Sequence, residues 1–400
     1  MDLHTGLPFW LIKNGLSHNY PSLQKDAKTK VVILGGGITG AIQAYFLAKA
    51  KIDFILLEKR SIGLGSTSAS TALLQYQIDE PLSSLIEKVG KNNAIRAYEL
   101  CAESIQTIKS ISKDIGHENY QTHPTLFYAS YKKDVPLIEK EYQIHKEAGF
   151  DVEFWGQSKI KKNFNLDFPA ALYSRHSAQI DAFKFCHQCM QYAINNGQQI
   201  YDRTDVVNIK HKNDGVKIET ADGYTIQAEW LIYATGYEVV DFISKDIVNL
   251  NSTWAIVSEQ FDDIEEFWHE NALIWETKLP YLYMRTTADH RIMLGGRDEN
   301  TNNPKRRLEA LKEKSKKLAT DFAKLFPQYE FVPEFSWSGT FGSTKDGLPY
   351  IGKYKNKPQG LFALGFGGNG ITFSTIAAEM LRDEILEKDN QDIKIFAFDR

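Results

Sequence analysis

Residues 31–40 read Val-Val-Ile-Leu-Gly-Gly-Gly-Ile-Thr-Gly, and this stretch decides the fold. The apolar, mostly β-branched run predicts a buried strand, and the pattern of Ala41–Ala48 predicts a helix. Gly35, Gly37 and Gly40 occupy the GxGxxG positions. These glycines allow a tight turn, a close approach of backbone to a pyrophosphate and close packing of helix on strand. The stretch therefore predicts a Rossmann-type βαβ unit that binds a dinucleotide.

A second apolar run, Phe54–Leu57, predicts the next strand, which ends at Glu58 and Lys59. In such units a carboxylate about 20 residues beyond the glycines binds a ribose hydroxyl. Ile38 and Thr39 open the helix, whose free N–H groups face the phosphates. An acid at position 58 disfavours the 2′-phosphate of NADP. It leaves NAD and the adenosine half of FAD as alternatives.

Composition sets the broad class of the protein. A chain of 400 residues exceeds the usual size of one hydrophobic core, which predicts two domains. The 42% apolar content and the net charge of −4 are ordinary for a soluble enzyme and imply no general affinity for nucleic acid. We expect no transmembrane helix, because every apolar run is far shorter than about 20 residues, and we expect no signal peptide.

Cysteine usage bears on compartment and metal binding. Three cysteines in so long a chain suit a reducing compartment, which predicts a cytoplasmic protein. Cys186 and Cys189 form a CxxC pair, but their surroundings predict a helix and no second ligand pair completes a zinc site. We therefore expect these thiols to pack in the core, and we expect no bound metal.

Three further segments are rich in small residues. Residues 65–72 are small and hydroxyl-rich, the predicted strand 230–233 runs into Ala234-Thr235-Gly236, and the predicted strand 361–364 runs into a glycine-rich turn, 365–370, before a helix over 371–386. Small residues let backbone lie against a flat ring, and hydroxyls can donate to phosphate.

Together with residues 204–206 and 344–352, these segments resemble the D-amino-acid oxidase superfamily of flavoenzymes, which includes glycine oxidase, sarcosine oxidase and gamma-glutamylputrescine oxidase. The resemblance covers nearly the whole chain. It implies an α/β fold with a Rossmann-type, glutathione-reductase-like FAD-binding domain and a second α+β substrate domain built on a mostly antiparallel sheet.

The resemblance also implies which residues contact FAD. Val206 would meet the adenine, Ser66 and Thr67 the pyrophosphate, and Ala72 and Leu73 the isoalloxazine. The turn Gly367 to Ile371 would direct a helix N-terminus at the flavin N1/C2=O edge, which becomes negative on reduction. The full expected set is Gly35, Gly37, Ile38, Thr39, Gly40, Glu58, Lys59, Ser66, Thr67, Ala72, Leu73, Val206, Ala234, Thr235, Gly236, Gly367, Gly368, Asn369, Gly370 and Ile371.

Some superfamily members attach the flavin to a cysteine near the position of residues 337–340, where this chain has none. The resemblance therefore implies non-covalent FAD. It also implies a discontinuous domain arrangement. The expected FAD-binding domain comprises 27–112, 168–240 and 335–395, the substrate-binding domain comprises 113–167 and 241–334, and 1–26 form an N-terminal arm.

The substrate side is less well specified. Glycine oxidase holds its substrate carboxylate with an arginine where this chain has Phe341, which favours an amine substrate over an amino acid. Tyr281, Tyr283 and Arg285 alternate along one predicted strand and would share a face. Arg285 could then bind an anion, or it could pair with a surface carboxylate.

Two more residues are candidates for the active site because of the segments that they follow or lie in. Gln75 follows the flavin-contacting stretch, so it is a candidate wall of the pocket. Lys345 could place positive charge near the flavin for oxygen activation, although a lysine beside Asp346-Gly347 also suits an ordinary turn.

These inferences predict an FAD-dependent oxidoreductase that oxidises a C–N bond of an amine or amino acid. Hydride would pass to flavin N5, water would hydrolyse the resulting imine, and oxygen or another acceptor would reoxidise the flavin. The alternatives are a dehydrogenase of amino or hydroxy acids with a non-oxygen acceptor, and a flavin-binding subunit without catalysis. The oligomeric state stays open.

Overall fold

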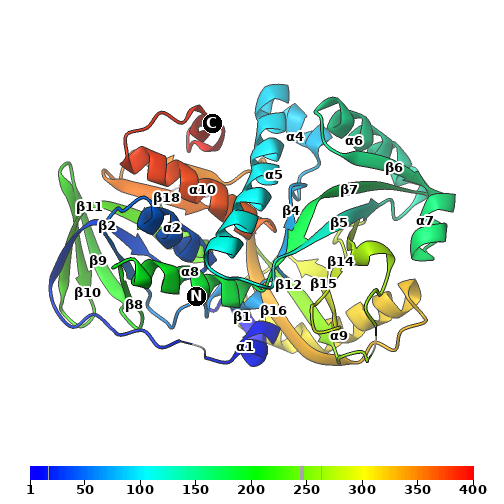
Figure 1. The fold of residues 1–400 in the computed structure, drawn as a ribbon, viewed down its shortest axis with the longest axis horizontal. Helices are drawn as coiled ribbons and strands as arrows, with labels where there is room; N and C mark the ends of the chain where they lie inside the picture. The colour runs from blue at the N-terminus through cyan, green and yellow to red at the C-terminus, as the bar shows by residue number, and fades with distance from the viewer. Residues whose placement is uncertain (17, 244–246, 263) are drawn as a thin grey trace.

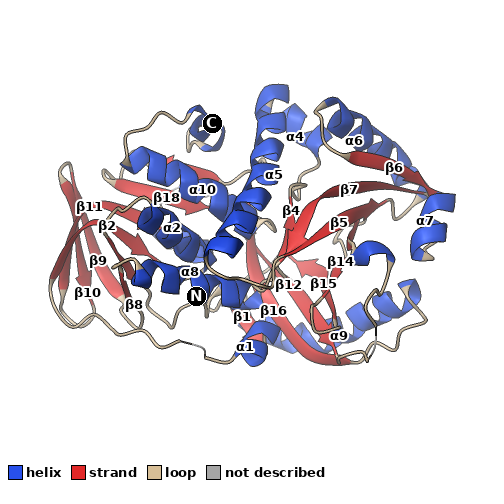
Figure 2. Ribbon diagram, in the orientation of Figure 1, coloured by secondary structure: helices blue, strands red, loops and turns tan. Residues whose placement is uncertain are grey.

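The structure is a computed structural model that describes residues 1–16, 18–243, 247–262 and 264–400. Two large sheets lie side by side, each with its own helices (Figures 1 and 2). The long helix α5 (Lys91–Asp114) runs between the two halves in this view. The mixed α/β architecture confirms the predicted fold class.

The first sheet has eight strands, and its centre is parallel. In spatial order the strands are β17 (Tyr350–Lys353), β18 (Gly360–Leu364), β11 (Thr225–Tyr233), β2 (Ala27–Leu34), β3 (Phe54–Leu57) and β8 (Gln199–Tyr201), with β10 (Gly215–Thr220) on β11 and β9 (Val206–Lys212) on β10. The predicted βαβ unit is present as β2, α2 (Ile38–Lys49) and β3.

Alternate residues of β2 enter two different cores. Val31 and Ile33 pack in the core that contains α2, whereas Val32 and Leu34 pack in a core with Val216 of β10. Because both faces of the strand are covered, its sequence is continuously apolar rather than alternating. Because both faces are covered, a ligand can reach this half of the molecule only at the ends of its strands.

The second sheet has ten strands and is antiparallel except where β13 meets β5. In spatial order the strands are β1 (His4–Gly6), β16 (Pro333–Ser343), β12 (Asn249–Ser258), β15 (Ile292–Glu299), β14 (Tyr283–Thr286), β13 (Leu273–Glu276), β5 (Gln121–Tyr128), β7 (Ala170–Gln179) and β4 (Leu73–Gln75), with β6 (Val152–Gly156) also on β7. Leu318 and Phe322 of α9 (Pro304–Leu325) share a core with Trp254 and Leu294 of this sheet.

The remaining helices connect and cover these sheets. They are α1 (Phe9–Asn14), α3 (Ser66–Ala69), α4 (Leu82–Val89), α6 (Val135–Glu147), α7 (Gln157–Phe164), α8 (Ala182–Asn195) and α10 (Gly370–Ile385), with short 3₁₀ turns η1 (Lys132–Asp134), η2 (Gly236–Phe242), η3 (His269–Asn271) and η4 (Gln391–Phe396). Helices α8, α2 and α10 pack side by side on the eight-stranded sheet (Figure 1).

The strand pairing does not follow the domain ranges expected from the sequence, so we propose a border at which the two domains exchange strands. β4, β7 and most of β16 fall within the ranges expected for the FAD-binding domain, yet all three strands are hydrogen-bonded in the ten-stranded sheet. The N-terminal arm joins the same sheet through β1, and Trp10 of α1 is buried against the molecule. The two halves thus exchange strands at their border, where sequence ranges alone give no boundary.

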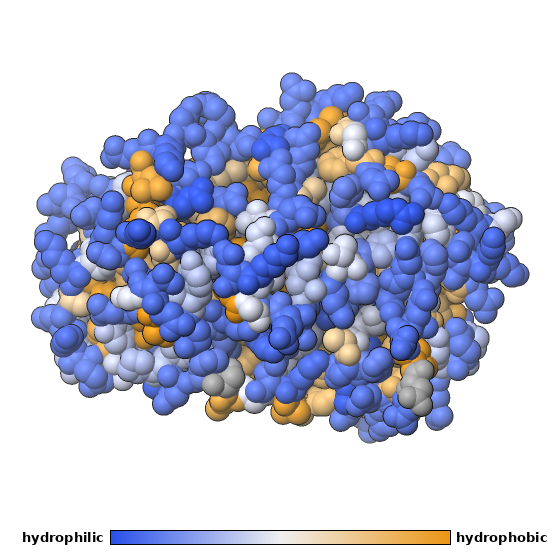
Figure 3. All heavy atoms as spheres, viewed as in Figure 1, coloured by the Kyte–Doolittle hydropathy of each residue, from blue (hydrophilic) through white to orange (hydrophobic). Residues whose placement is uncertain are grey.

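The visible surface is mostly polar, and the cysteines lie in the interior. Figure 3 shows a face that is mostly hydrophilic, with apolar residues in small separate groups. None of the described helices is both long and apolar enough to cross a membrane. Cys101, Cys186 and Cys189 are buried free thiols, and no set of three His, Cys, Asp or Glu residues within the described ranges is placed to hold a metal ion.

Candidate active site

A cavity of about 360 Å³ lies between the two sheets. It begins at the carboxyl ends of β2, β3 and β11, with Gly35, Glu58 and Ala234, and reaches Thr253 and Asp298 in the ten-stranded sheet. Ligands of open α/β sheets bind outside the carboxyl ends of the strands. We call its two parts the Glu58 side (Glu58, Lys59, Arg60, Val206, Glu238) and the Tyr283 side (Gln77, Asp79, Trp275, Tyr281, Tyr283, Asp298).

The glycine-rich turn has no room for a side chain at Gly35 or Gly40. Gly35 has φ +116°, and a Cβ there would lie 2.4 Å from the carbonyl oxygen of Ala234. A Cβ on Gly40 would lie 1.9 Å from the carbonyl oxygen of Gly35. Gly40 therefore lets α2 pack on the turn, as the sequence predicts, without itself lining the cavity.

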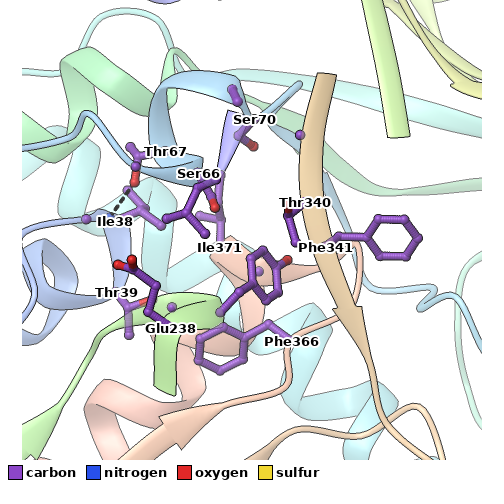
Figure 4. Close-up of a pocket in the computed structure, with 18 of the residues that line it drawn as sticks. Ile38, Thr39, Ser66, Thr67, Ser70, Glu238, Thr340, Phe341, Phe366 and Ile371 are labelled. Carbon is purple, nitrogen blue, oxygen red and sulfur yellow. Dashed lines mark hydrogen bonds between the residues drawn. The ribbon is translucent and has the colours of Figure 1, made fainter. Parts of the chain in front are cut away.

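The first turn of α2 opens onto the cavity. Gly37 precedes the helix and provides no side-chain cap, and Thr67 Oγ1 accepts a hydrogen bond of 2.8 Å from the N–H of Ile38 (Figure 4). Ser66 Oγ and Thr235 Oγ1 are buried and have no hydrogen-bond partner. Since buried polar groups are normally paired, these hydroxyls fit a polar ligand at the helix N-terminus, such as a pyrophosphate.

Acidic and basic side chains meet on the Glu58 side. Glu58 accepts hydrogen bonds from the N–H groups of Gly36 (2.7 Å) and Arg60 (2.8 Å). Glu238 accepts from Lys59 Nζ (2.8 Å) and Arg60 Nη2 (2.7 Å). Burial by itself would raise the pKa of Glu238, but the hydrogen bonds from Arg60 and Lys59 lower that pKa to about 2. Among the described residues that line the cavity, Lys59 and Arg60 are the basic ones.

The turn before α10 forms another wall. Tyr237 donates a hydrogen bond of 3.0 Å to the carbonyl oxygen of Gly367, which has φ +58°. The amide of Asn369 donates to the carbonyl oxygens of Gln75 (3.3 Å) and Gln77 (3.2 Å), so it does not cap the helix. The N-terminus of α10 therefore lines the cavity without a cap from Asn369, and the nearby Gly368 N–H donates to Asp79.

The Tyr283 side carries two carboxylates. Tyr281 donates 2.9 Å to Asp79 Oδ1, and the N–H of Gly368 donates 2.7 Å to Asp79 Oδ2. Burial raises the pKa of Asp79. For Asp298, burial and the charge of Asp79 outweigh a hydrogen bond with Thr253 and raise the pKa to about 6.

The structure brings together nearly all of the expected cofactor residues. Gly35, Gly37, Ile38, Thr39, Glu58, Lys59, Ser66, Thr67, Ala72, Leu73, Val206, Ala234, Thr235, Gly236, Gly367, Gly368, Asn369, Gly370 and Ile371 all line the cavity. Gln75, Tyr281 and Tyr283 from the substrate-side candidates line it too, as does Phe341, whose ring points away from Ser66 and Thr67 in Figure 4.

Arg285 does not line the cavity, so the expectation that it shares the exposed face of the two tyrosines needs correction. Its Nη1 donates to the carbonyl oxygens of Ala72 (2.9 Å) and Ile180 (3.1 Å), and its guanidinium lies 5.5 Å from the ring centroid of Trp10. Burial lowers the pKa of Arg285 to about 9. Ala72 thus stands between this cation and the cavity.

Lys345 also lies outside the cavity lining, exposed in the turn that follows β16. Its position suits the ordinary turn lysine that the sequence left as an alternative. Sequence reasoning missed Asp79, Asp298, Trp275, Tyr237 and Glu238. Trp275 lies in an apolar strand that resembles plain core, and no short-range pattern marks the two aspartates.

A family model described as FAD dependent oxidoreductase (DAO) matches residues 30–384. The chain belongs to this family. This FAD dependent oxidoreductase is 23% identical to the probable oxidoreductase OrdL of Haemophilus influenzae, over 93% of this chain and 86% of that one. It is 22% identical to gamma-glutamylputrescine oxidoreductase of Escherichia coli, over 94% and 88% of the two chains.

A solved structure has the same fold. The crystal structure of glycine oxidase from Geobacillus kaustophilus superposes on this FAD dependent oxidoreductase with a TM-score of 0.79 at 21% identity, covering 92% of this chain and 98% of the other. The cofactor of the family fits the cavity. Unpaired buried hydroxyls and the N-termini of two helices line the cavity, and the glycines of the turn leave the backbone open to a close ligand.

Proposed function

We propose that this enzyme oxidises a C–N bond of an amine or amino acid bound on the Tyr283 side of the cavity. One observation carries the proposal: a single cavity joins the GxGxxG turn and the N-terminus of α10 to a wall from the ten-stranded sheet. The activities named for two similar proteins support it, since gamma-glutamylputrescine and glycine both contain C–N bonds.

Bound FAD supplies a two-electron acceptor for the hydride of the substrate carbon. The residues of this chain position and enclose the reactants. The α2 turn with Ser66 and Thr67 would hold the pyrophosphate, and Glu58 would hold a ribose. The N-terminus of α10, fixed by Tyr237 and Asn369, would stabilise negative charge on the flavin edge that it faces.

The Tyr283 side would orient the substrate. Trp275, Tyr281 and Tyr283 supply aromatic walls that exclude water, and correct placement of the C–H bond contributes most to the rate. The oxidised substrate leaves as an imine that water hydrolyses. Oxygen or another acceptor then takes the electrons.

We also propose that the FAD is not covalently bound. All three cysteines lie in α5 and α8, and none of them lines the cavity. Acid precipitation should therefore release the flavin into the supernatant. Free, buried thiols also support a reducing, cytoplasmic compartment.

The test is anaerobic reduction of the flavin by amines and amino acids, followed by oxygen or a redox dye. Loss of the yellow colour with any of these substrates supports the proposal. Rapid reoxidation by oxygen identifies an oxidase, and reoxidation by dye alone identifies a dehydrogenase. A flavin-loaded protein that none of them reduces would instead be a binding subunit, and the proposed activity would be withdrawn.

A further inference from the structure

We infer that the Tyr283 side selects a cationic amine without a carboxylate near the reacting carbon, and that Asp79 and Asp298 bind its positive charge. This inference rests on the proposed function, because it concerns the substrate of the same cavity. It goes further by excluding amino acids as preferred substrates.

Asp79 is held in place as an acceptor. Asp79 lines the cavity, and solvent reaches its side chain there. The surrounding protein nevertheless makes burial the largest cause of its raised pKa. Tyr281 and the N–H of Gly368 each donate to one of its oxygens. A carboxylate offers about four acceptor sites, so both oxygens keep capacity for a further donor. The two hydrogen bonds fix the carboxylate without neutralising its charge.

Asp298 forms no ion pair of its own among the described residues, and the one cation there that acts on it, Lys314, is paired with another carboxylate. The neighbouring Arg297 pairs with Asp321, and Lys314 pairs with Glu299 at 2.8 Å. Asp298 Oδ1 is buried and has no hydrogen-bond partner. An unpaired buried carboxylate is costly. A bound ammonium group would supply the missing opposite charge, and it would pass one proton to the Asp298 carboxylate before its carbon gives up hydride, because an ammonium nitrogen has no lone pair with which to form the imine.

The aromatic wall is a second and independent observation that indicates a ligand. Trp275 is only 8% exposed, lines the cavity, and its indole N–H has no partner. Its ring centroid lies 6.3 Å from that of Tyr281, which lies 5.8 Å from that of Tyr283. Aromatic faces attract ammonium groups through their quadrupole. Three aromatic rings beside two carboxylates form a suitable environment for a cation.

The same environment disfavours an anion. Lys59 and Arg60, the basic residues among the described cavity lining, are on the Glu58 side and are engaged with Glu238. Arg285 is separated from the cavity by Ala72. A substrate carboxylate on the Tyr283 side would therefore face two acids with no partner, at a high desolvation cost.

The experiment uses three probes of similar shape that cannot be oxidised, because their central carbon carries no hydrogen. They are tert-butylammonium, pivalate and 2-aminoisobutyrate, titrated calorimetrically into the FAD-loaded protein. We expect tert-butylammonium to bind at least tenfold more tightly than either of the others. Equal or tighter binding of pivalate or 2-aminoisobutyrate overturns the inference.

Charge-removing variants locate the site. Asp79→Asn and Asp298→Asn keep the side-chain shape and should each weaken tert-butylammonium binding about 10- to 100-fold, the range for a hydrogen bond to a charged group. Glu265→Gln removes the same charge from an exposed position outside the cavity lining and should bind normally. Flavin content and melting temperature verify folding. Unchanged or tighter binding in both aspartate variants contradicts the assignment.

The outcomes separate this inference from the proposed function. If neither amines nor amino acids reduce the flavin, the proposed function fails whatever the probes show. If glycine or a D-amino acid reduces the flavin as well as butylamine does, the proposed function stands and the selection for cations is wrong.

Discussion

The hydroxyl of Tyr281 donates a hydrogen bond of 2.9 Å to Oδ1 of Asp79, a residue 202 positions away in the chain. This contact joins the segment before β14 to the loop that follows β4, across the Tyr283 side of the cavity. It orients the carboxylate that we assign to the substrate cation. Two distant parts of the ten-stranded sheet thus meet at the binding site through a pair of side chains.

Removing this hydroxyl tests that contact. Tyr281→Phe leaves Asp79 with one donor fewer, and a hydrogen bond to a charged group contributes about 1.5–3 kcal/mol. We expect KM for an amine substrate to rise about tenfold with a smaller change in kcat, as measured by steady-state kinetics. Tyr131→Phe, at an exposed tyrosine, serves as the control. A fall in kcat with unchanged KM would place Tyr281 in the chemical step instead.

The glycine-rich turn gives a sharper steric prediction. Gly40→Ala would put a methyl group 1.9 Å from the carbonyl oxygen of Gly35. The turn must then shift, at a cost of about 1–3 kcal/mol or more, and FAD affinity should fall strongly. Gly156→Ala is a suitable control, because a Cβ at Gly156 meets no atom within 4 Å. Flavin fluorescence titration measures both, and a normal affinity in Gly40→Ala would contradict the model of the turn.

Arg285 should behave as a structural residue. Arg285→Met leaves the carbonyl oxygens of Ala72 and Ile180 without this donor, and we expect a loss of about 1–3 kcal/mol in the free energy of unfolding. Arg175→Met, at a half-exposed arginine, should change stability little. Denaturant unfolding measures both variants. Unchanged stability together with a specific loss of anion binding would restore Arg285 as a substrate clamp.

Asp298 predicts a pH dependence in the FAD-free protein. Its pKa is raised from 3.8 to about 6. Between these two pH values the folded state keeps the proton on Asp298, whereas the unfolded state has released it. Its contribution to stability is therefore full below about pH 4 and declines as the pH rises through 6, by up to about 3 kcal/mol.

Asp298→Asn should abolish that part of the pH slope, measured by denaturant unfolding between pH 4 and 7. The charged or polar groups that act on Asp298 are Asp79, Lys314 and Thr253, and they remain in the variant. An identical slope in both proteins would show that Asp298 titrates normally.

Much of the Glu58 side could be predicted because its signals are local. Gly35, Gly40 and Glu58 lie within one βαβ unit, where strand, turn and helix fix their relative positions. Thr67 and Ile371 needed the resemblance to a known family, since each reaches the cavity from a distant segment. Because members of a family share one fold, the motif that contains such a residue indicates its place in the cavity.

The Tyr283 side could not be predicted in the same way. Asp79 and Asp298 share the cavity only because β15 and the loop after β4 converge, and no spacing in the sequence encodes that convergence. Alternation correctly placed Tyr283 and Arg285 on one strand, but β14 begins at Tyr283, so Tyr281 lies before the strand rather than on it. It could not show that Ala72 would cover the arginine, because that contact joins residues 213 positions apart.

The most direct test of the central claim is the visible spectrum of the FAD-loaded protein during anaerobic titration with butylamine, 1,4-diaminobutane, glycine and D-alanine. We predict a flavin spectrum that the two amines bleach and the amino acids leave oxidised. A protein that stays colourless after FAD is supplied, or a flavin that none of the four compounds reduces, would contradict the account.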